Sequence, residues 1–414
     1  MRAADFKYPS HVIPPSLDNA GLFDQFLPCR IDAFFEGVDV NVMCYGQTGT
    51  GKTHTIFGTP GIMSRAGRGE YGHAVTLDYG IFPRTLLAVF ARAQALGDSC
   101  VVTCSAIELD MVNGNKCMFS TTRVRRSQGL SSPHAFGVTI DKTAKPARMY
   151  GMKELVLESE EDILRVFAAI ATRNTAGTGM NDNSSRTHCF VAINLHVAIP
   201  AAGDIAGGAR VRSSRFQFVD LAGSERLKDS AGTTNPMDSA TALQGMCTHF
   251  SLTELGACLG RVHEHNRKMK KKTGKAKKPF SVRFICDLVS LLEKTITGSA
   301  ASAVIVCVSQ APSNASQSSF ALNFGKDFSR LAVTPRPRRS APLAKLHLQA
   351  TKRRQEAVEK LAAATTSSKY RVVRTAQKLD AEQMLDVLER LSKGEGGGGG
   401  GGGVGGESGG ACSK

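Results

Sequence analysis

The 414-residue chain has no uninterrupted apolar run of about 18 residues, the length a helix needs to cross a membrane. Its first residues, MRAADFK, also lack the apolar stretch of a secretory signal peptide. We therefore expect a soluble, intracellular protein with no membrane span. Eleven cysteines are scattered along the chain without a C-x-x-C pair. This distribution favours neither a disulfide framework nor a zinc site, and most of the thiols are expected to be buried as small hydrophobic groups.

Positive charge is abundant but confined to two stretches. The formal net charge is +16. Segment 261–278 holds nine basic residues against Glu264, and segment 332–414 holds fifteen against eight acids. The remainder of the chain is close to neutral, so an acidic partner would be met by one loop and one tail.

Residues 46–53 match the phosphate-binding pattern G-x-x-x-x-G-K-[ST] at every fixed position, directly after an apolar, strand-like run at 38–45. The motif consists of Gly46, Gln47, Thr48, Gly49, Thr50, Gly51, Lys52 and Thr53. Its glycines allow backbone N–H groups to point inward at phosphate oxygens. Lys52 is expected to reach the β and γ phosphates, and Thr53 to offer its hydroxyl to Mg²⁺. The alternative is a glycine-rich turn that contains a lysine by chance, and the preceding strand counts against it.

Two more polar clusters follow along the chain. The segment 181–188, NDNSSRTH, lies between a predicted helix and a predicted strand, where taken alone it is more typical of a capping turn. The segment 220–226, DLAGSER, comes directly after the apolar strand 216–219. An acid at the end of a buried strand beside a phosphate loop is the usual partner of Mg²⁺, which makes Asp220 a metal candidate. Gly223 would let a backbone N–H approach the γ phosphate.

Helical and strand-like patterns alternate as far as residue 331, which predicts an α/β fold. Helices are predicted at 21–36, 85–95, 158–173 and 320–331, and strands at 38–45, 101–109, 189–197, 216–219 and 303–309. Two further helical stretches, 343–364 and 372–392, keep heptad spacing too briefly for a stable coiled coil. We divide the chain into a main domain at 1–333, a basic linker with short helices at 334–393 and a disordered, glycine-rich tail at 394–414.

Taken together, YGQTGTGKTHT, GIFPR, NDNSSRTH and DLAGSER resemble the motor domain of a kinesin, from about residue 6 to residue 331. The resemblance implies a P-loop NTPase fold of the kinesin type, with a central, twisted, mostly parallel or mixed sheet flanked by helices on both faces. It also implies ATP and Mg²⁺ as ligands, ATP hydrolysis as the activity, and a microtubule as the partner. The expected location is the cytoplasm, on the cytoskeleton.

The resemblance also assigns roles to individual residues. Asn181, Ser184 and Ser185 would form the first switch, with Ser184 at the γ phosphate and Ser185 on Mg²⁺. Arg186 would pair with Glu225 of the second switch to position the attacking water. His54 would stack on adenine. The expected catalytic residues are thus Asn181, Ser184, Arg186, Gly223 and Glu225, and the expected metal ligands are Thr53, Ser185 and Asp220.

Three parts of the chain depart from the kinesin pattern. No R-x-R-P strand precedes residue 6, so either the chain is truncated or adenine is held loosely, and the strand at 303–309 would become a sheet edge. The helix after the second switch, commonly E-G-x-x-I-N-x-S-L, reads QGMCTHFSL at 244–252. The segment Y-R-D-S-K-L-T of the filament-facing surface has no clear counterpart within 279–292.

The lysine-rich stretch Arg267–Lys278 has two interpretations. It is either a solvated charge run or, as in some transport kinesins, a loop that contacts the acidic tails of tubulin. The sequence therefore predicts a microtubule motor that hydrolyses ATP, and the alternative is a non-motile microtubule-binding relative with weak or absent ATPase. A nucleic-acid translocase is disfavoured because no aromatic stacking pattern accompanies the basic stretches, and a signalling GTPase because no N-K-x-D motif occurs. The sequence leaves direction of movement, cargo and oligomeric state open.

Overall fold

The computed structural model describes residues 11–72, 74–112, 114–120, 138–141, 148–174, 186–200, 208–225, 240–270, 280, 286–363 and 369–395. Within these residues, eight strands form one sheet whose main path runs β3-β2-β7-β8-β1-β9, with β10 paired to β8 and β6 to β2. The strands are β1 (Val40–Gly46), β2 (Cys100–Leu109), β3 (Lys116–Cys117), β6 (Leu155–Val156), β7 (His188–Ile199), β8 (Arg210–Asp220), β9 (Ala301–Cys307) and β10 (Ala341–Pro342). Strands β8, β1 and β9 are parallel, whereas β2, β7 and β8 are antiparallel, so the sheet is mixed as predicted.

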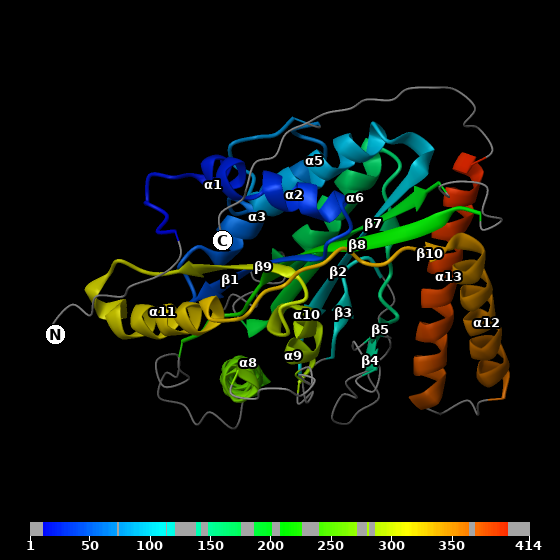
Figure 1. The fold of residues 1–414 in the computed structure, drawn as a ribbon. Coiled ribbons are helices and arrows are strands. Elements are labelled where there is room, and N and C mark those ends of the chain that lie inside the picture. The colour runs from blue at the N-terminus through cyan, green and yellow to red at the C-terminus, as the bar shows by residue number, and fades with distance from the viewer. Residues whose placement is uncertain are drawn as a thin grey trace.

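Helices cover both faces of this sheet (Figure 1). One face carries α1 (Asn19–Phe26), α2 (Pro28–Phe35), α3 (Lys52–Phe57), α5 (Ile81–Gln94) and α6 (Glu160–Asn174), with α4 (Ile62–Gly67) packed against α6. The other face carries α8 (Ala240–Lys270), α9 (Asp287–Leu291), α10 (Glu293–Ile296) and α11 (Ala315–Ser329). A small second sheet pairs β4 (Thr139–Asp141) with β5 (Arg148–Tyr150), and the short helices η1 (Gly97–Ser99) and η4 (Pro312–Asn314) complete this part.

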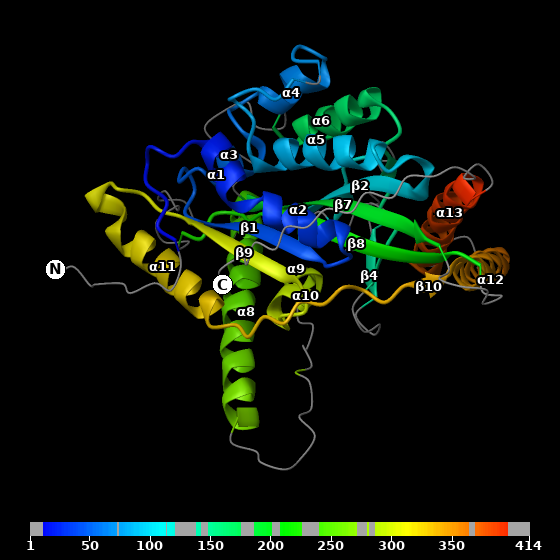
Figure 2. The same ribbon diagram turned by 45° about the horizontal axis from the view of Figure 1, so that its top comes forward.

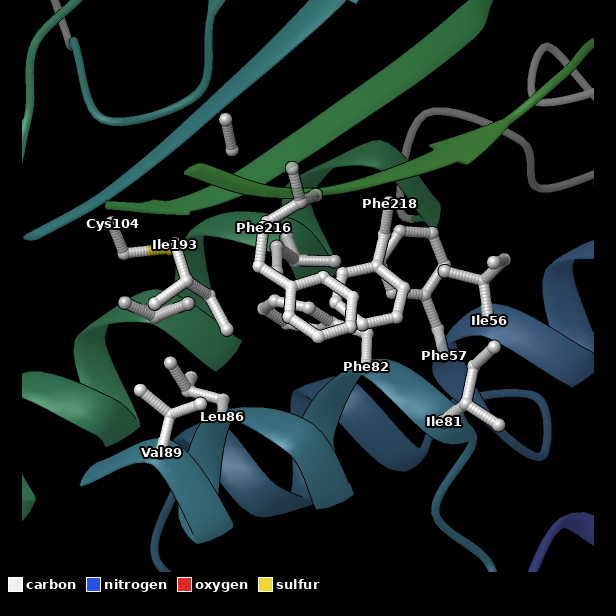
Figure 3. Close-up of a cluster of buried hydrophobic side chains, with 14 of the residues drawn as sticks. Ile56, Phe57, Ile81, Phe82, Leu86, Val89, Cys104, Ile193, Phe216 and Phe218 are labelled. Atoms are coloured by element: carbon white, nitrogen blue, oxygen red, sulfur yellow. The ribbon is translucent and has the colours of Figure 1, made fainter. Parts of the chain in front are cut away.

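Alternation along the central strand β1 divides the core into two layers. Val42 and Cys44 belong to the cluster that includes α5 and α6, whereas Met43 and Tyr45 belong to the cluster that includes α8 and α11. Successive side chains of a strand point to opposite faces, so a strand buried on both faces reads as a continuous apolar run. This explains the continuous apolar sequence at 42–45, whereas the two polar residues before it have polar partners, Asp39 with Lys294 and Arg338 and Asn41 with Gln217. Figure 3 shows the first layer, where Phe216 and Phe218 of β8 face Phe82 of α5.

The predicted helix at 21–36 is wrong in one respect, because it is two helices that meet at Leu27 and Pro28. Proline lacks a backbone N–H and cannot donate a hydrogen bond within a helix, so Pro28 stands as the first residue of α2, where that donor is not needed. Other predicted elements are confirmed, some with longer bounds. The predicted strand at 216–219 extends back to Arg210, for example, and pairs antiparallel with β7 along its length.

Strand β9 is the edge of the sheet. Within the described residues it pairs with β1 alone, and each of its seven residues is half-buried. This agrees with the exposed edge expected from the sequence at 303–309.

Beyond α11, residues 332–342 form a strap that crosses the ends of β9, β1 and β8. The backbone N–H of Thr334 donates to the carbonyl of Gly298, and that of Arg338 to the carbonyl of Gly37. The Arg338 guanidinium lies 2.7 Å from the carboxylate of Asp39. Burial alone would raise the pKa of Asp39, but Arg338 and Lys294 together hold that pKa below its ordinary value. The strap ends in β10, which pairs with Arg210 and Val211 of β8.

Helices α12 (Leu343–Ala362) and α13 (Lys369–Glu395) follow as an antiparallel pair, here called the C-terminal hairpin (Figure 1). Their existence was predicted at nearly these positions, but their packing was not. Leu388 and Leu391 of α13 are buried in a cluster with Val101 of β2 and Val211 of β8. The Gln383 side chain accepts a 2.7 Å hydrogen bond from the N–H of Glu154. The hairpin therefore covers the end of the sheet remote from the phosphate loop, and the three-part division of the chain stays a prediction.

No helix in the described part of the chain combines the length and apolarity required to span a lipid bilayer.

Candidate nucleotide site

The phosphate loop connects the end of β1 to the start of α3. Gly49 and Gly51 have φ values of +79° and +95°, in the left-handed region that favours glycine. A Cβ at Gly46 would lie 2.1 Å from the backbone oxygen of Cys307, so the neighbouring strand β9 also requires glycine there. The strand, loop and helix expected of a phosphate-binding motif are thus present.

Lys52 is buried within the curl of this loop. Its Nζ donates a 2.8 Å hydrogen bond to the backbone oxygen of Gln47, a contact that a phosphate oxygen can replace. Burial lowers the pKa of Lys52, although the carboxylates of Asp220 and Glu225 oppose that shift. The hydrogen bond to Gln47 holds the ammonium group inside the loop.

Thr53 and Asp220 lie together as the sequence predicted. The Thr53 hydroxyl donates a 2.7 Å hydrogen bond to Oδ2 of Asp220 at the end of β8. The second oxygen, Oδ1, is buried and has no hydrogen-bond partner within the described residues. A hydroxyl and a carboxylate with a free lone pair are the oxygen ligands that Mg²⁺ prefers, so these residues fit that ion.

Arg173 is a site residue that sequence reasoning missed. Its guanidinium donates a 2.6 Å hydrogen bond to Oδ2 of Asp220 and a 3.1 Å bond to the Thr187 carbonyl, with only 1% of the side chain exposed. Burial would lower the pKa of Arg173, but neighbouring acidic groups, including Asp220 and Glu108, raise it above its ordinary value. In the sequence it is simply the last arginine of a predicted helix, with nothing to separate it from an exposed one.

The DLAGSER cluster touches the phosphate loop directly. The carboxylate of Glu225 accepts hydrogen bonds from the Thr48 N–H, at 2.8 Å, and from the Thr48 hydroxyl, at 2.5 Å. The N–H of Ser224 donates to the Gly46 carbonyl. A Cβ on Gly223 would lie 2.3 Å from the Thr48 hydroxyl oxygen, so this close approach depends on glycine.

The predicted pair of Arg186 and Glu225 is not joined in this structure, in which the described contacts of Glu225 go to Thr48. The backbone oxygen of Arg186 instead accepts a hydrogen bond from Thr248 of α8. Because the pair was expected to close on a bound γ phosphate, it stays a prediction. Asn181, Ser184 and Ser185 of the first switch lie outside the described residues.

His188, at the start of β7, connects three elements. Its Nδ1 accepts a hydrogen bond from the Ala222 N–H at 3.1 Å, and its Nε2 lies 2.7 Å from the Ser251 hydroxyl of α8. Since Nδ1 is the acceptor, the proton resides on Nε2. Burial, helped by the charges of Arg173 and Lys52, lowers the pKa of His188 to about 3, so the ring is neutral. The sequence placed His188 in a motif without giving it a role.

His54, the residue expected to stack on adenine, makes fewer contacts than the residues above. The His54 side chain is exposed on α3, and its carbonyl accepts a 3.0 Å hydrogen bond from the Asn19 amide of α1. Stacking of His54 on adenine stays a prediction.

The phosphate loop has two further contacts. The amide nitrogen of Gln47 lies 3.4 Å from the Asn314 side chain, beside the start of α11. The hydroxyl of Thr50 closes the loop on the Gln47 carbonyl at 2.8 Å.

The divergent segment 244–252 lies in α8, a 31-residue helix whose C-terminal half projects beyond the rest of the molecule (Figure 2). Leu243, Met246 and Phe250 are exposed by 40% or more and follow helical spacing, so they form an apolar stripe. Of the basic stretch 267–278, only residues 267–270 are described, and Lys268 pairs with Glu264.

The comparisons with known proteins agree with this geometry. The family model for the kinesin motor domain matches residues 1–331. Kinesin-like protein KIN-4C of Oryza sativa subsp. japonica is 28% identical over 313 residues, covering 72% of this chain and 22% of that protein. Kinesin-like protein K39 of Leishmania chagasi is 30% identical over 316 residues, covering 73% of this chain and 29% of that protein. The chain therefore spans less than a third of these relatives.

Two solved kinesin structures share the fold. One is a KIF14 dimer with AMP-PNP in complex with a microtubule, with a TM-score of 0.57, 22% identity, and 77% of this chain and 79% of that chain covered. The other is a fast kinesin, with a TM-score of 0.54, 18% identity, and coverage of 78% and 79%. Together with the family match over most of the chain and the site just described, this shows that the protein belongs to the kinesin motor-domain family.

Proposed function

We propose that this domain binds and hydrolyses ATP with Mg²⁺ and couples that reaction to its grip on a microtubule. The observation that carries the proposal is the contact of three clusters, in which Thr53 meets Asp220 and Glu225 meets Thr48 beside a buried Lys52. Phosphoryl transfer to water needs positioning and charge neutralisation more than covalent catalysis, and these groups provide both.

Each residue has a defined part in this proposal. Lys52 and the loop N–H groups bind the β and γ phosphates, and Thr53 and Asp220 hold the metal, with Ser185 as the third protein ligand. Bound Mg²⁺ neutralises the charge that develops on the phosphate oxygens. Ser184 and the Gly223 N–H approach the γ phosphate, with Asn181 in the same switch.

The attacking water is positioned by Arg186 and Glu225. For that pair to form, the Glu225 carboxylate exchanges its bonds to Thr48 for the Arg186 guanidinium when the γ phosphate is bound. This exchange makes loop position depend on the nucleotide, as in other γ-phosphate switches.

The proposed microtubule surface lies along α8. The KIF14 structure is that of a complex with a microtubule, which supports the same partner for this chain. The basic stretch Arg267–Lys278 at the end of α8 offers positive charge, and the stripe of Leu243, Met246 and Phe250 offers apolar contact area. A protein acting this way would reside on the cytoskeleton in the cytoplasm.

A non-motile, microtubule-binding relative with weak or absent ATPase is the second candidate. It is favoured by the altered positions 244–250, because that part of α8 contacts Arg186 through Thr248 and also carries Met246 and Phe250 of the proposed filament surface. Both candidates bind microtubules, and they differ in whether microtubules stimulate ATP turnover.

One assay separates them, namely ATP turnover measured with and without microtubules at low and moderate salt. A motor is stimulated many-fold, because filament contact accelerates product release or loop closure. A non-motile binder sediments with microtubules without stimulation, and ATP binding with zero turnover in both conditions contradicts the motor proposal.

Salt and charge removal test the basic stretch in the same assay. Binding is expected to fall steeply as salt rises, since exposed charges are screened within about 8 Å at physiological ionic strength. Alanine at Lys270, Lys271 and Lys272 is expected to weaken microtubule affinity more than maximal turnover, because these residues belong to none of the motifs of the nucleotide site. Alanine at Lys345, Lys352 and Lys360, three exposed lysines of α12, is the matched control.

A further inference from the structure

One face of α8 makes a row of polar contacts to the core, here called the polar seam. It consists of Gln244, Thr248 and Ser251, which follow helical spacing. The Gln244 amide donates a 2.8 Å hydrogen bond to Oδ2 of Asp110, just after β2. The seam thus faces the ends of two strands. Gln244 contacts the residue that follows β2, and Ser251 contacts His188 at the start of β7.

The middle contact of the seam is made by Thr248, which is 8% exposed. Its hydroxyl oxygen lies 2.5 Å from the Arg186 carbonyl and 2.9 Å from the Gln244 carbonyl of its own helix. A hydroxyl has one hydrogen to donate, and the shorter distance assigns it to Arg186. The backbone of Arg186 is therefore fastened to α8, while its guanidinium belongs to the proposed pair with Glu225.

Ser251 forms the third contact, and its hydrogen bonds have a fixed direction. Its hydroxyl donates to the Thr248 carbonyl at 2.6 Å, so it accepts from Nε2–H of His188. His188 in turn accepts from the Ala222 N–H of the DLAGSER cluster. The same helix face is thus connected to both polar clusters of the site.

Two of the three seam positions, Gln244 and Thr248, are among the three fixed positions at which segment 244–252 departs from the kinesin pattern. Glu and Ile are usual where Gln244 and Thr248 stand. An isoleucine has no hydrogen to donate, so the bond to Arg186 exists because of the departure. The altered segment therefore carries specific contacts of its own.

We propose that Thr248 is a positioning residue, whose hydroxyl holds Arg186 in the place from which it meets Glu225 and so couples the position of α8 to the nucleotide site. This rests on the proposed function, because it concerns how that site communicates with α8. A displacement of α8 by about 1 Å lengthens the distance between the Thr248 hydroxyl and the Arg186 carbonyl beyond that of a good hydrogen bond, and the backbone of Arg186 is then no longer held.

The test compares Thr248→Val, which keeps the shape and removes the hydroxyl, with Thr248→Ser, which keeps the hydroxyl. The first measurement is hydrogen–deuterium exchange of nucleotide-free protein. Loss of one hydrogen bond predicts roughly three- to tenfold faster exchange at residues 186–190 in the valine variant and near wild-type exchange in the serine variant. Equal exchange in the two variants overturns the proposal.

The second measurement is the change in α8 exchange on adding AMP-PNP, with AMP-PNP affinity titrated separately. We expect the response of α8 to be reduced roughly three- to tenfold by Thr248→Val and retained by Thr248→Ser, with affinity within about twofold of wild type. The proposal is overturned if the wild-type protein binds AMP-PNP without a change in α8 exchange, or if both variants lose that change. Failure of the wild type to bind AMP-PNP contradicts the proposed function instead, and the nucleotide-free measurement still decides the role of Thr248.

Discussion

The hydroxyl of Thr53 lies 2.7 Å from Oδ2 of Asp220, although 167 positions separate these residues in the chain. The contact exists because β1 and β8 are parallel neighbours, which brings the phosphate loop at the end of one strand beside the acid at the end of the other. Carboxyl ends of adjacent parallel strands are where open α/β sheets bind ligands. The sheet register therefore brings together Thr53 and Asp220, two of the proposed metal ligands.

Replacing Lys52 with alanine is expected to weaken ATP binding by roughly 10- to 150-fold, the value of a hydrogen bond to a charged group. The fold should remain, because among the described residues the Lys52 ammonium donates a hydrogen bond only to the Gln47 carbonyl. Nucleotide titration and thermal melting check both statements. Lys345→Ala on the exposed side of α12 is the control, and unchanged affinity in Lys52→Ala contradicts the site assignment.

Arg173→Leu is expected to lower the free energy of unfolding by about 3–5 kcal/mol, because it leaves the buried Asp220 carboxylate without its cation. Arg165→Ala on the same helix is the matched control. Its side chain is 59% exposed and pairs with Glu161 and Asp162 of its own helix, so its loss should cost about 1 kcal/mol or less. Denaturant unfolding of both variants gives the comparison, and similar values for the two would show that Arg173 does not stabilise Asp220.

Gly223→Ala is expected to lower ATP turnover roughly 100-fold, since its Cβ would lie 2.3 Å from the Thr48 hydroxyl oxygen and displace the cluster from the phosphate loop. Gly256→Ala is the control, because a Cβ there meets nothing within 4 Å and α8 should gain about 0.5–1 kcal/mol of stability. Turnover and unfolding measurements on both variants separate the local clash from a general effect of alanine. Normal turnover in Gly223→Ala would contradict the close approach.

Arg186→Ala, Glu225→Ala and the double variant are expected to lose similar amounts of ATP turnover, because the two residues act as one unit in the proposed mechanism. Single-turnover kinetics in all three measures this. Losses that simply add would indicate that the two side chains do not meet during hydrolysis.

His188 predicts a pH dependence of stability whose sign follows from its pKa. The unfolded chain binds a proton near the ordinary value of 6.5, whereas burial keeps the folded ring neutral down to about pH 3. The unfolded state therefore binds more protons in that window, and stability falls as pH drops from 6.5 to 3, by an amount on the order of 5 kcal/mol. Unfolding of wild type and His188→Gln across this range isolates the effect, and identical pH slopes would contradict it.

The sequence was sufficient to predict β1, but it did not reveal the buried arginine of α6. The continuous apolar residues at 42–45, directly before the phosphate loop, identified β1, because a strand buried on both faces is apolar at successive positions. The glycines, Lys52 and Asp220 were identifiable as candidates because phosphate and metal binding would restrict which residues can stand there. Arg173 was missed because an arginine directed inward and one directed to solvent look the same in a sequence, and only the packing of α6 distinguishes them.

Other features depend on tertiary packing that no local pattern records. The heptad spacing in 372–392 was too short for a coiled coil, and nothing in it showed that Leu388 and Leu391 would pack on β2 and β8. The segment 244–252 departs from the kinesin pattern, yet Gln244 and Thr248 within it both bond to the core. Such contacts join residues far apart in the chain, and sequence spacing does not reveal them.

The docking of α13 on the sheet determines how a mechanical load applied at residue 395 would travel. The C-terminal turns of α13 are attached to the body of the domain through Leu388 and Leu391 and through the ion pair of Arg390 with Glu158. A pull at that end therefore acts first on these contacts, and its force enters the sheet through β2 and β8. The strap at 332–342 carries tension only after α13 has detached, so the hairpin shields the strap from force.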